Sequence, residues 1–368
     1  MAAGGPIRVL VVDDSAVVRS VLRKGLEEAG GLEVVGVAHN GRQGLEMVAS
    51  TRPDAVILDV LMPEMTGIEF LDHLQPGQAE TPVVLMFSSM SKQDAEVTVE
   101  CLSRGAEEFI NKPDPGRTGL REPLEDTVGE LARTVRELVR ARREPGHGED
   151  GGRGAAAREG HSGAGGVPAG FQPDLVVIGS STGGPQTLHA ILGELDPTGA
   201  ARVPVLLVQH MALGFTGAFA QRLGERGPFR WLEAEDGQKV PLGAGLVAPG
   251  DHHMRVSRDA KRLTVHLDHR ERVNSCRPAV DPLFISAAEL QGTRVLGIVL
   301  TGMGRDGLEG ARRIRAAGGK VVVQDERSSA VWGMPGAIAR EGLADAVLEP
   351  GEIAALLDRV LFSRATSA

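Results

Sequence analysis

A serine, a histidine and an aspartate each follow a short apolar run in the C-terminal half of the chain. They are Ser181, His210 and Asp306. Parallel strands gather the residues at their carboxyl ends along one edge of a sheet. The pattern therefore predicts a nucleophilic serine, with histidine as its base and aspartate orienting the histidine. The three apolar runs span residues 175–178, 203–208 and 295–300.

The turn that contains Ser181 reads Gly179-Ser180-Ser181-Thr182-Gly183. Gly-x-Ser-x-Gly between a strand and a helix is typical of a nucleophile elbow, because glycines permit a sharp turn that exposes the serine. Glycine-rich turns at this place also cradle phosphates. A dinucleotide or Walker site fits less well, since this turn lacks Gly-x-Gly-x-x-Gly and no lysine follows it. Other histidines compete with His210 for the role of base: His189, His252, His253, His266 and His269.

Three carboxylates and a lysine end apolar runs in the N-terminal half. Asp13 and Asp14 follow the first run, Asp59 follows the third, and Lys112 follows the fifth. Carboxylates that converge at one sheet edge repel each other, and a hard cation such as Mg²⁺ relieves this repulsion. A carboxylate beside such a cation and a lysine is a candidate phosphoryl acceptor. Taken singly, paired aspartates are often helix caps, and a Lys-Pro pair is often a solvated turn.

The elements that position these residues alternate between strand and helix. Five apolar runs rich in β-branched residues are separated by helix-compatible stretches, which predicts parallel sheets covered on both faces. We predict an α/β protein: an N-terminal flavodoxin-like domain with a five-stranded parallel sheet, and a C-terminal doubly wound α/β domain of the serine-hydrolase kind. The N-terminal strands are predicted at 7–12, 34–38, 55–58, 83–87 and 107–110, with helices at 17–29 and 41–50 and an apolar helical stripe from 120 to 138.

Charge and glycine content divide the chain. Residues 1–145 carry 16 basic and 24 acidic side chains, whereas residues 146–368 carry 24 and 25. The stretch 144–172 contains ten glycines and only two large apolar residues, so we predict a flexible linker rather than a long surface loop. The predicted organisation is a domain at 1–143, the linker at 144–172 and a second domain at 173–364.

Composition excludes several classes of protein. The 368 residues are 42% hydrophobic and 24% charged, as in ordinary globular proteins. The net charge of −9 argues against a protein that coats nucleic acid. Apolar runs fall far short of the roughly 20 residues that span a bilayer. The two cysteines, Cys101 and Cys276, form no disulfide framework, and no leader is visible, so we expect a cytoplasmic protein without membrane insertion.

Residues 7–140 resemble the receiver domain of two-component response regulators. The motifs are Val-Asp-Asp-Ser at 12–15, Leu-Asp-Val-Leu-Met-Pro-Glu-Met-Thr-Gly at 58–67 and Asn-Lys-Pro at 111–113. The resemblance implies phosphorylation of Asp59 and binding of Mg²⁺ by Asp13, Asp14 and Asp59. It further implies that Ser88 is the switch hydroxyl, Phe109 the switch aromatic and Lys112 the phosphate partner. Leu61 replaces a residue that is often polar in the family, which affects the expected lifetime of the phosphorylated state.

Residues 173–362 resemble the catalytic domain of chemotaxis protein-glutamate methylesterases, the CheB family. The motifs include Gly-Ser-Ser-Thr-Gly-Gly-Pro at 179–185, Gln-His-Met at 209–211, Arg-Pro-Ala-Val-Asp at 277–281, Leu-Thr-Gly-Met-Gly-Arg-Asp-Gly at 300–307 and Trp-Gly-Met-Pro at 332–335. The resemblance implies that Ser181 is the nucleophile, His210 the general base and acid, and Asp306 the orienting residue. It places the backbone N–H of Met303, with Thr182 nearby, in the oxyanion hole. The spacing between Ser181 and His210 leaves room for an enlarged loop at 196–202.

The two resemblances together imply a phosphorylation-activated esterase. It hydrolyses glutamate γ-methyl esters on the cytoplasmic helices of chemoreceptors and deamidates glutamines, and the esterase step uses no cofactor. Methylated chemoreceptors and a chemotaxis histidine kinase are the expected partners. From the predicted linker, which tethers the receiver near the catalytic domain without fixing its pose, we expect the unphosphorylated receiver to obstruct the catalytic cleft. The segment 255–277 carries seven basic and three acidic residues. That segment is either a solvated face or a surface that attracts an acidic receptor bundle.

Two other functions stay open at this point. One is a response regulator with a non-enzymatic output such as DNA binding, which requires a helix-turn-helix or a basic recognition helix. The second half supplies glycine turns at strand ends instead. The other is a scaffold that has kept the fold and lost turnover, and the presence of all three triad residues argues against it.

Overall fold

The computed structural model describes residues 5–74, 81–89, 92–113, 121–143, 166–196, 201–227, 230–259 and 262–362. The chain divides into two compact units, Met1–Pro145 and Gly146–Ala368. Most of the predicted linker at 144–172 lies outside the described residues, so the linker and the predicted domain limits stay predictions.

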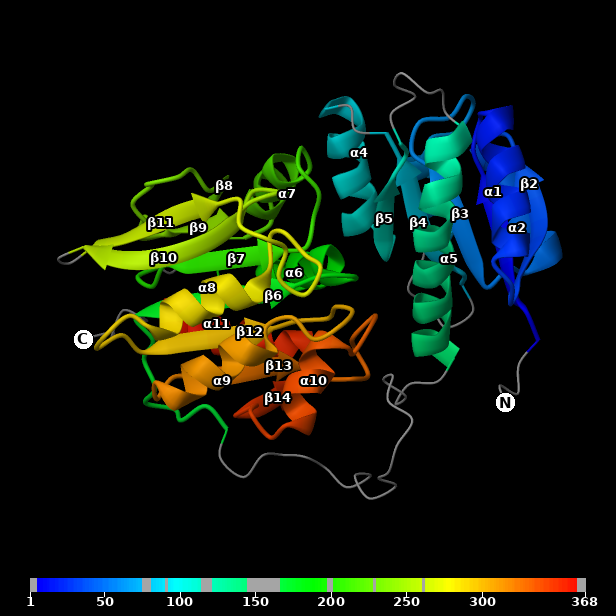
Figure 1. Ribbon diagram of the computed structural model, residues 1–368. Helices are drawn as coiled ribbons and strands as arrows, with labels where there is room; N and C mark the ends of the chain where they lie inside the picture. Colours follow the sequence, from blue (N-terminus) through cyan, green and yellow to red (C-terminus); the bar gives the residue numbers. More distant parts are fainter. Residues whose placement is uncertain are drawn as a thin grey trace. The chain divides into compact units, whose positions relative to one another are not determined.

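The first unit contains a five-stranded parallel sheet in the order β2-β1-β3-β4-β5 (Figure 1). This order confirms the predicted flavodoxin-like fold, and every predicted strand lies within two residues of the observed one. The strands are β1 (Ile7–Val12), β2 (Leu32–Ala38), β3 (Ala55–Asp59), β4 (Val83–Ser88) and β5 (Glu108–Asn111). The helices are α1 (Ala16–Glu28), α2 (Gly41–Thr51), α3 (Gly67–Leu74), α4 (Lys92–Ser103) and α5 (Arg121–Arg143).

Local sequence explains where these helices begin and how they pack. Ser15 and Asn40 cap α1 and α2, each accepting a hydrogen bond from a backbone N–H three residues later. The apolar stripe of α5 is buried, as its spacing predicts. Gly25 of α1 brings that helix close to α5, since a Cβ on Gly25 would lie 2.7 Å from a methyl carbon of Val128. The stripe consists of Leu124, Val128, Leu131, Val135 and Leu138, and Leu120 lies outside the described residues.

The second unit contains a seven-stranded parallel sheet in the order β14-β13-β12-β6-β7-β9-β8. The strands are β6 (Leu175–Ser180), β7 (Val205–Gln209), β8 (Arg230–Glu233), β9 (Ala244–Val247), β12 (Val295–Val299), β13 (Lys320–Gln324) and β14 (Ala346–Leu348). The helices are α6 (Gly184–Gly193), α7 (Thr216–Gly224), α8 (Val280–Ala288), α9 (Leu308–Ala316), α10 (Met334–Arg340) and α11 (Pro350–Leu361). The chain first builds outward from β6 through β7 and then returns to place β12 on the other side of β6. Such a reversal of direction is where parallel α/β sheets bind ligands.

An antiparallel hairpin of β10 (His253–Asp259) and β11 (Arg262–Asp268) lies outside the main sheet. The sequence analysis interpreted 255–277 as a solvated face or a basic surface and assigned no strands to it. Met254 and Val256 of β10 are buried in the core, whereas Arg255 and His266 alternate with them on the outer face. The charged outer positions therefore hide the period-two pattern of the apolar ones.

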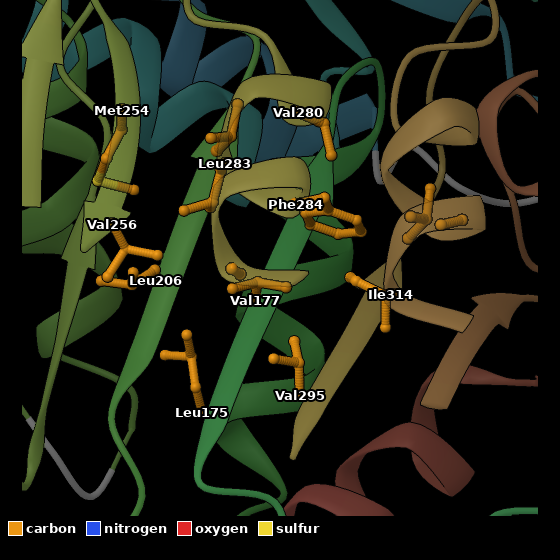
Figure 2. Close-up of a cluster of buried hydrophobic side chains, with 14 of the residues drawn as sticks. Leu175, Val177, Leu206, Met254, Val256, Val280, Leu283, Phe284, Val295 and Ile314 are labelled. Carbon is orange, nitrogen blue, oxygen red and sulfur yellow. The ribbon is translucent and has the colours of Figure 1, made fainter. Parts of the chain in front are cut away.

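Helix α8 covers the strands that carry the candidate triad. Figure 2 shows its side chains Val280, Leu283 and Phe284 gathered with Val177 of β6 and Leu206 of β7 in one buried cluster. Burying a side chain such as Phe284 completely stabilises the fold by about 1.5–3 kcal/mol. Glycine at 179, in β6, allows a close approach, because a Cβ there would lie 2.5 Å from Val280 Cγ1. The first turn of α8 is thereby fixed over the carboxyl end of β6. Among the residues that the structure describes, no helix is both long and apolar enough to cross a membrane.

Candidate active site and phosphorylation site

The two serines in the turn after β6 have different surroundings. Ser180 is fully buried, and its hydroxyl donates to Gln209 Oε1 at 2.7 Å. The Ser181 side chain has no hydrogen-bond partner among the described residues, and the residue is 8% exposed. The left-handed residue of the turn is Gly183, with φ of 75°, which caps α6. Ser180 is therefore fixed inside the sheet, while the hydroxyl of Ser181 is available.

Two buried side chains from neighbouring strands hold this turn in place. Gln209 Nε2 donates to the carbonyl of Ser181 at 2.9 Å. Thr301, which follows β12, accepts the Ser181 N–H at its own carbonyl at 3.0 Å. The hydroxyl of Thr301 also donates to the carbonyl of Thr182 at 2.9 Å. Because Gln209 and Thr301 are 2% and 0% exposed, these bonds do not compete with water and the turn is rigid.

His210 and Asp306 form a buried pair beside the turn. His210 Nε2 lies 2.7 Å from Asp306 Oδ2. A carboxylate only accepts, so Nε2 carries the proton and Nδ1 is the nitrogen left to act as a base. Burial alone lowers the pKa of His210, but its interactions with Asp306 and Cys276 outweigh burial and raise the pKa above 6.5. The same contact helps to lower the pKa of Asp306, although burial opposes this shift.

Backbone N–H groups surround the Asp306 carboxylate. Val280 N donates to Oδ2 at 2.6 Å, while Asp281 N and Gly307 N donate to Oδ1 at 3.2 and 3.0 Å. Val280 and Asp281 form the first turn of α8, whose dipole favours a negative charge at this end. The fold thus keeps Asp306 ionised although it is 1% exposed.

Three residues near the triad were missed by the sequence analysis. Asn274 and Asp281 contact the Asp306 carboxylate, and Cys276 Sγ lies 3.5 Å from His210 Nδ1. Asn274 and Cys276 belong to a tight turn far from Asp306 in sequence. Asp281 was part of a quoted motif, but nothing in its spacing indicated contact with Asp306.

The residues expected to form the oxyanion hole lie beside Ser181. Thr182 is buried, and Met303 is half-buried in the loop after β12. The residue between Thr301 and Met303 must be glycine, since a Cβ on Gly302 would lie 2.7 Å from Ser181 Cβ. The backbone that leads to Met303 N is thereby brought against Ser181.

The competing histidines have other surroundings. His189 lies in α6 and accepts from Arg226 at 2.6 Å. His253 is fully buried and holds two backbone groups, the carbonyl of Glu271 and the N–H of Ala279. His252 packs against His269, and His266 contacts Ser257 on the hairpin. His210 is therefore the histidine that the structure brings to Asp306. The expected enlarged loop at 196–202 lies partly outside the described residues.

In the first unit the predicted acidic residues converge. Asp13, Asp14 and Asp59 each offer a carboxylate oxygen within 4.8 Å of the others. Lys112 Nζ lies 2.8 Å from Asp13 and 2.6 Å from Asp59. Burial, with a contribution from Asp13, raises the pKa of Asp59 to about 6 against the opposing effect of Lys112. One ammonium does not balance three carboxylates, and the all-oxygen donor set is the kind that Mg²⁺ prefers. The cluster therefore fits that ion.

Ser88 ends β4, and Phe109 lies in β5, the strand that precedes Lys112. Ser88 is 1% exposed, and its carbonyl accepts the Lys112 N–H at 2.6 Å. Phe109 is already buried at 9% exposure. Leu61, two residues after Asp59, is 40% exposed.

Comparison with known proteins gives a family for the whole chain. Residues 176–357 match the CheB methylesterase family model, and residues 9–120 match the response regulator receiver domain. A protein-glutamate methylesterase/protein-glutamine glutaminase from a Nocardioides species is 43% identical over 343 residues, covering 93% of this chain and 92% of the relative. This chain belongs to the CheB methylesterase family. A second relative of that name, numbered 2, from Caulobacter vibrioides is 40% identical over 348 residues, covering 94% of this chain and 96% of the relative.

The CheB family also includes a solved structure similar to part of this chain. The crystal structure of the Thermotoga maritima CheB methylesterase catalytic domain is 38% identical, with a TM-score of 0.49. The match covers 52% of this chain and 100% of that chain.

Proposed function

We propose that this CheB-family chain is a phosphorylation-controlled serine esterase that hydrolyses glutamate γ-methyl esters on chemoreceptors and deamidates their glutamines. The observation that carries the proposal is the 2.7 Å contact between His210 Nε2 and Asp306 Oδ2 beside Ser181. Relatives over most of the chain are named for both reactions. The receiver match supports control by phosphorylation.

In the first half of the reaction Ser181 attacks the ester. The Ser181 proton passes to His210 Nδ1 as Oγ bonds to the γ-carbonyl carbon, and Asp306 stabilises the imidazolium that forms. The tetrahedral intermediate then loses its methoxy group, which takes the proton from Nδ1 and leaves as methanol. A glutamine γ-amide follows the same path and releases ammonia.

In the second half water completes the hydrolysis. His210 takes a proton from water as the water oxygen attacks the acyl carbon, and returns that proton to Ser181 Oγ as the acyl bond breaks. The backbone N–H of Met303, with Thr182 nearby, is proposed to stabilise the oxyanion in both halves. The product is a γ-carboxylate.

In the receiver unit Asp59 is the proposed phosphoacceptor. Asp13, Asp14 and Asp59 would hold Mg²⁺, which supplies positive charge to a transferred phosphoryl group. Lys112 is placed to contact a phosphoryl oxygen, and Ser88 and Phe109 are the proposed switch residues. A chemotaxis histidine kinase is the proposed phosphodonor. The proposed site of the phosphorylation is therefore the cytoplasm. Phosphorylation is proposed to relieve obstruction of the esterase by the receiver.

Removal of one carboxylate from the cluster is expected to weaken Mg²⁺ binding. Asp13→Ala removes one of the three proposed ligands. The positive charge of Lys112 then faces two carboxylates instead of three, so the cluster attracts a cation less strongly. We expect the Mg²⁺ dissociation constant, measured by titration calorimetry on the full chain, to rise by about tenfold or more. Asp72→Asn, on an aspartate that pairs with Arg104 at the surface, is the matched control and should bind as wild type does. Equal Mg²⁺ affinity in Asp13→Ala and wild type would remove Asp13 from the ligand set.

Alkylation of Cys276 is expected to inactivate the esterase. A carboxamidomethyl group on its sulfur would crowd His210 Nδ1, which lies 3.5 Å away. Cys101 is buried in the other unit, and burial raises the pKa of its thiol to about 12, so iodoacetamide should leave it unmodified. We expect Cys101→Ala to stay sensitive to the reagent and Cys276→Ala to become resistant. Peptide mapping that finds Cys276 alkylated in a fully active enzyme contradicts this placement.

The proposed function is tested on its substrates. The full chain is incubated with receptor fragments that carry methylated glutamates and glutamines, and mass spectrometry follows each site. We expect the methyl esters to become carboxylates and the glutamines to become glutamates. A chain that binds the fragments without changing any site is the scaffold, and one that binds DNA instead is the response regulator with a non-enzymatic output.

A further inference from the structure

We propose that Asn274 is a positioning residue of this esterase, whose side-chain amide bridges Asp281 and Asp306 and fixes the carboxylate that orients His210. The inference rests on the proposed esterase function, because it concerns the same triad. It adds a residue that acts on His210 only through Asp306.

One amide nitrogen serves both carboxylates. Asn274 Nδ2 lies 2.9 Å from Asp281 Oδ2 and 2.8 Å from Asp306 Oδ1. An amide nitrogen carries two hydrogens, so each carboxylate receives one of them. Asp306 and Asp281 are only 1% and 6% exposed, and water cannot readily replace either hydrogen bond.

The two oxygens of Asp306 have separate partners. Oδ2 faces His210, and Oδ1 faces Asn274. His210 and Asn274 donate to Asp306 from their side chains, and Val280, Asp281 and Gly307 donate through backbone N–H groups. Asn274 therefore restricts rotation of the carboxylate from the side opposite His210, which keeps Oδ2 directed at the imidazole.

The bridge also places a hydrogen-bond donor between two buried carboxylates that interact with each other. Burial and the charge of Asp306 raise the pKa of Asp281, whereas the pKa of Asp306 is lowered, in part by its bonds to His210 and Asn274. Gly310 N donates to the other oxygen of Asp281 at 2.7 Å. Without the amide, the facing carboxylates would hold a proton between them. A proton on Asp306 would weaken its interaction with the imidazolium.

The turn that carries Asn274 suits this residue. Val273 and Cys276 exchange backbone hydrogen bonds of 3.1 and 2.9 Å, and the two central residues, Asn274 and Ser275, have φ of 51° and 66°. Two residues of positive φ between such a pair form a type I′ turn. Asparagine tolerates this conformation better than most residues. The position therefore accepts glycine without backbone strain, which allows the amide to be removed alone.

The test uses two substitutions in the full chain, Asn274→Gly and Asn274→Asp. Glycine keeps the left-handed turn and deletes the amide, so we expect kcat to fall by about 10- to 100-fold with KM unchanged, as misplacement of a catalytic group does. Aspartate keeps the shape but adds a third carboxylate beside Asp281 and Asp306. We expect a larger loss than for glycine near neutral pH.

The pH dependence separates positioning from simple packing. As pH falls, protonation of the added carboxylate in Asn274→Asp removes the repulsion, so its rate relative to wild type at the same pH should rise. The other titratable groups joined to this cluster are His210, which contacts Asp306, and Cys276, which contacts His210, and both are present in every variant. The rate of Asn274→Gly relative to wild type should change less with pH, because glycine adds no titratable group.

Ser275→Gly is the matched control, because it alters the same turn and spares the amide; it should keep the wild-type kcat. Thermal unfolding shows that each variant is folded. If wild type is active and Asn274→Gly has the same kcat, the inference is wrong. That result does not contradict the esterase function. A changed KM alone, or an Asn274→Asp ratio that does not vary with pH, also overturns the inference. A wild type that turns over no ester contradicts the proposed function itself.

Discussion

Ser181→Ala is expected to lower the rate of ester hydrolysis by about 10⁴- to 10⁶-fold, the usual range when a triad nucleophile is removed. The fold should be unaffected, because the Ser181 side chain makes no hydrogen bond among the described residues. Its N–H and carbonyl, which anchor the turn through Thr301 and Gln209, are kept. The rate is measured as methanol release from methylated receptors, with thermal unfolding as the check on folding.

Ser180→Ala is the matched control for the nucleophile. Ser180 is buried and donates to Gln209, so its substitution should cost about 1 kcal/mol of stability and far less activity. The two serines are adjacent and differ in surroundings rather than in chemistry. If Ser180→Ala abolished hydrolysis and Ser181→Ala did not, the nucleophile would have to be reassigned.

Phosphorylation of Asp59 is expected to raise the esterase rate of the full chain about 30- to 150-fold. That range corresponds to a coupling free energy of about 2–3 kcal/mol between the phosphorylated receiver and the accessible esterase. A small acyl phosphate with Mg²⁺ serves as the phosphodonor. Initial rates of methanol release are compared with and without it.

Asp59→Asn identifies the acceptor in this experiment. An amide cannot take up the phosphoryl group, so the variant should keep the basal rate and show no activation. Asp72→Asn, outside the acidic cluster, should be activated as wild type is. Activation that persists in Asp59→Asn would place the acceptor elsewhere. A full chain that takes up phosphate on Asp59 and is not accelerated would refute control by obstruction.

Much of the fold could be predicted because buried parallel strands have continuous apolar sequences. The predicted strands of the receiver unit match the observed ones, and helix starts follow from caps such as Ser15 and Asn40. The hairpin at 253–268 could not be predicted in this way. Its outer positions carry arginine and histidine, so its alternation reads as a polar stretch rather than as strands.

The triad residues were predictable for a similar reason. Ser181, His210 and Asp306 each follow a buried strand, and β6, β7 and β12 are neighbours in the sheet. Asn274 and Cys276 reach the same place from a tight turn outside the sheet, and no period or spacing ties a turn to a strand end. Their contacts depend on two left-handed residues and on the position of α8, which only the packed structure supplies. The roles of the triad residues stay predictions until they are tested by substitution.

The most direct test of the account is the release of methanol from receptors that carry labelled methyl esters, measured with the purified full chain, Mg²⁺ and an acyl phosphate. We expect volatile labelled methanol to appear far faster than in the absence of enzyme, in an amount equal to the ester lost from the receptor. Release no faster than spontaneous hydrolysis, from a chain that is folded and phosphorylated on Asp59, would contradict the proposed esterase function.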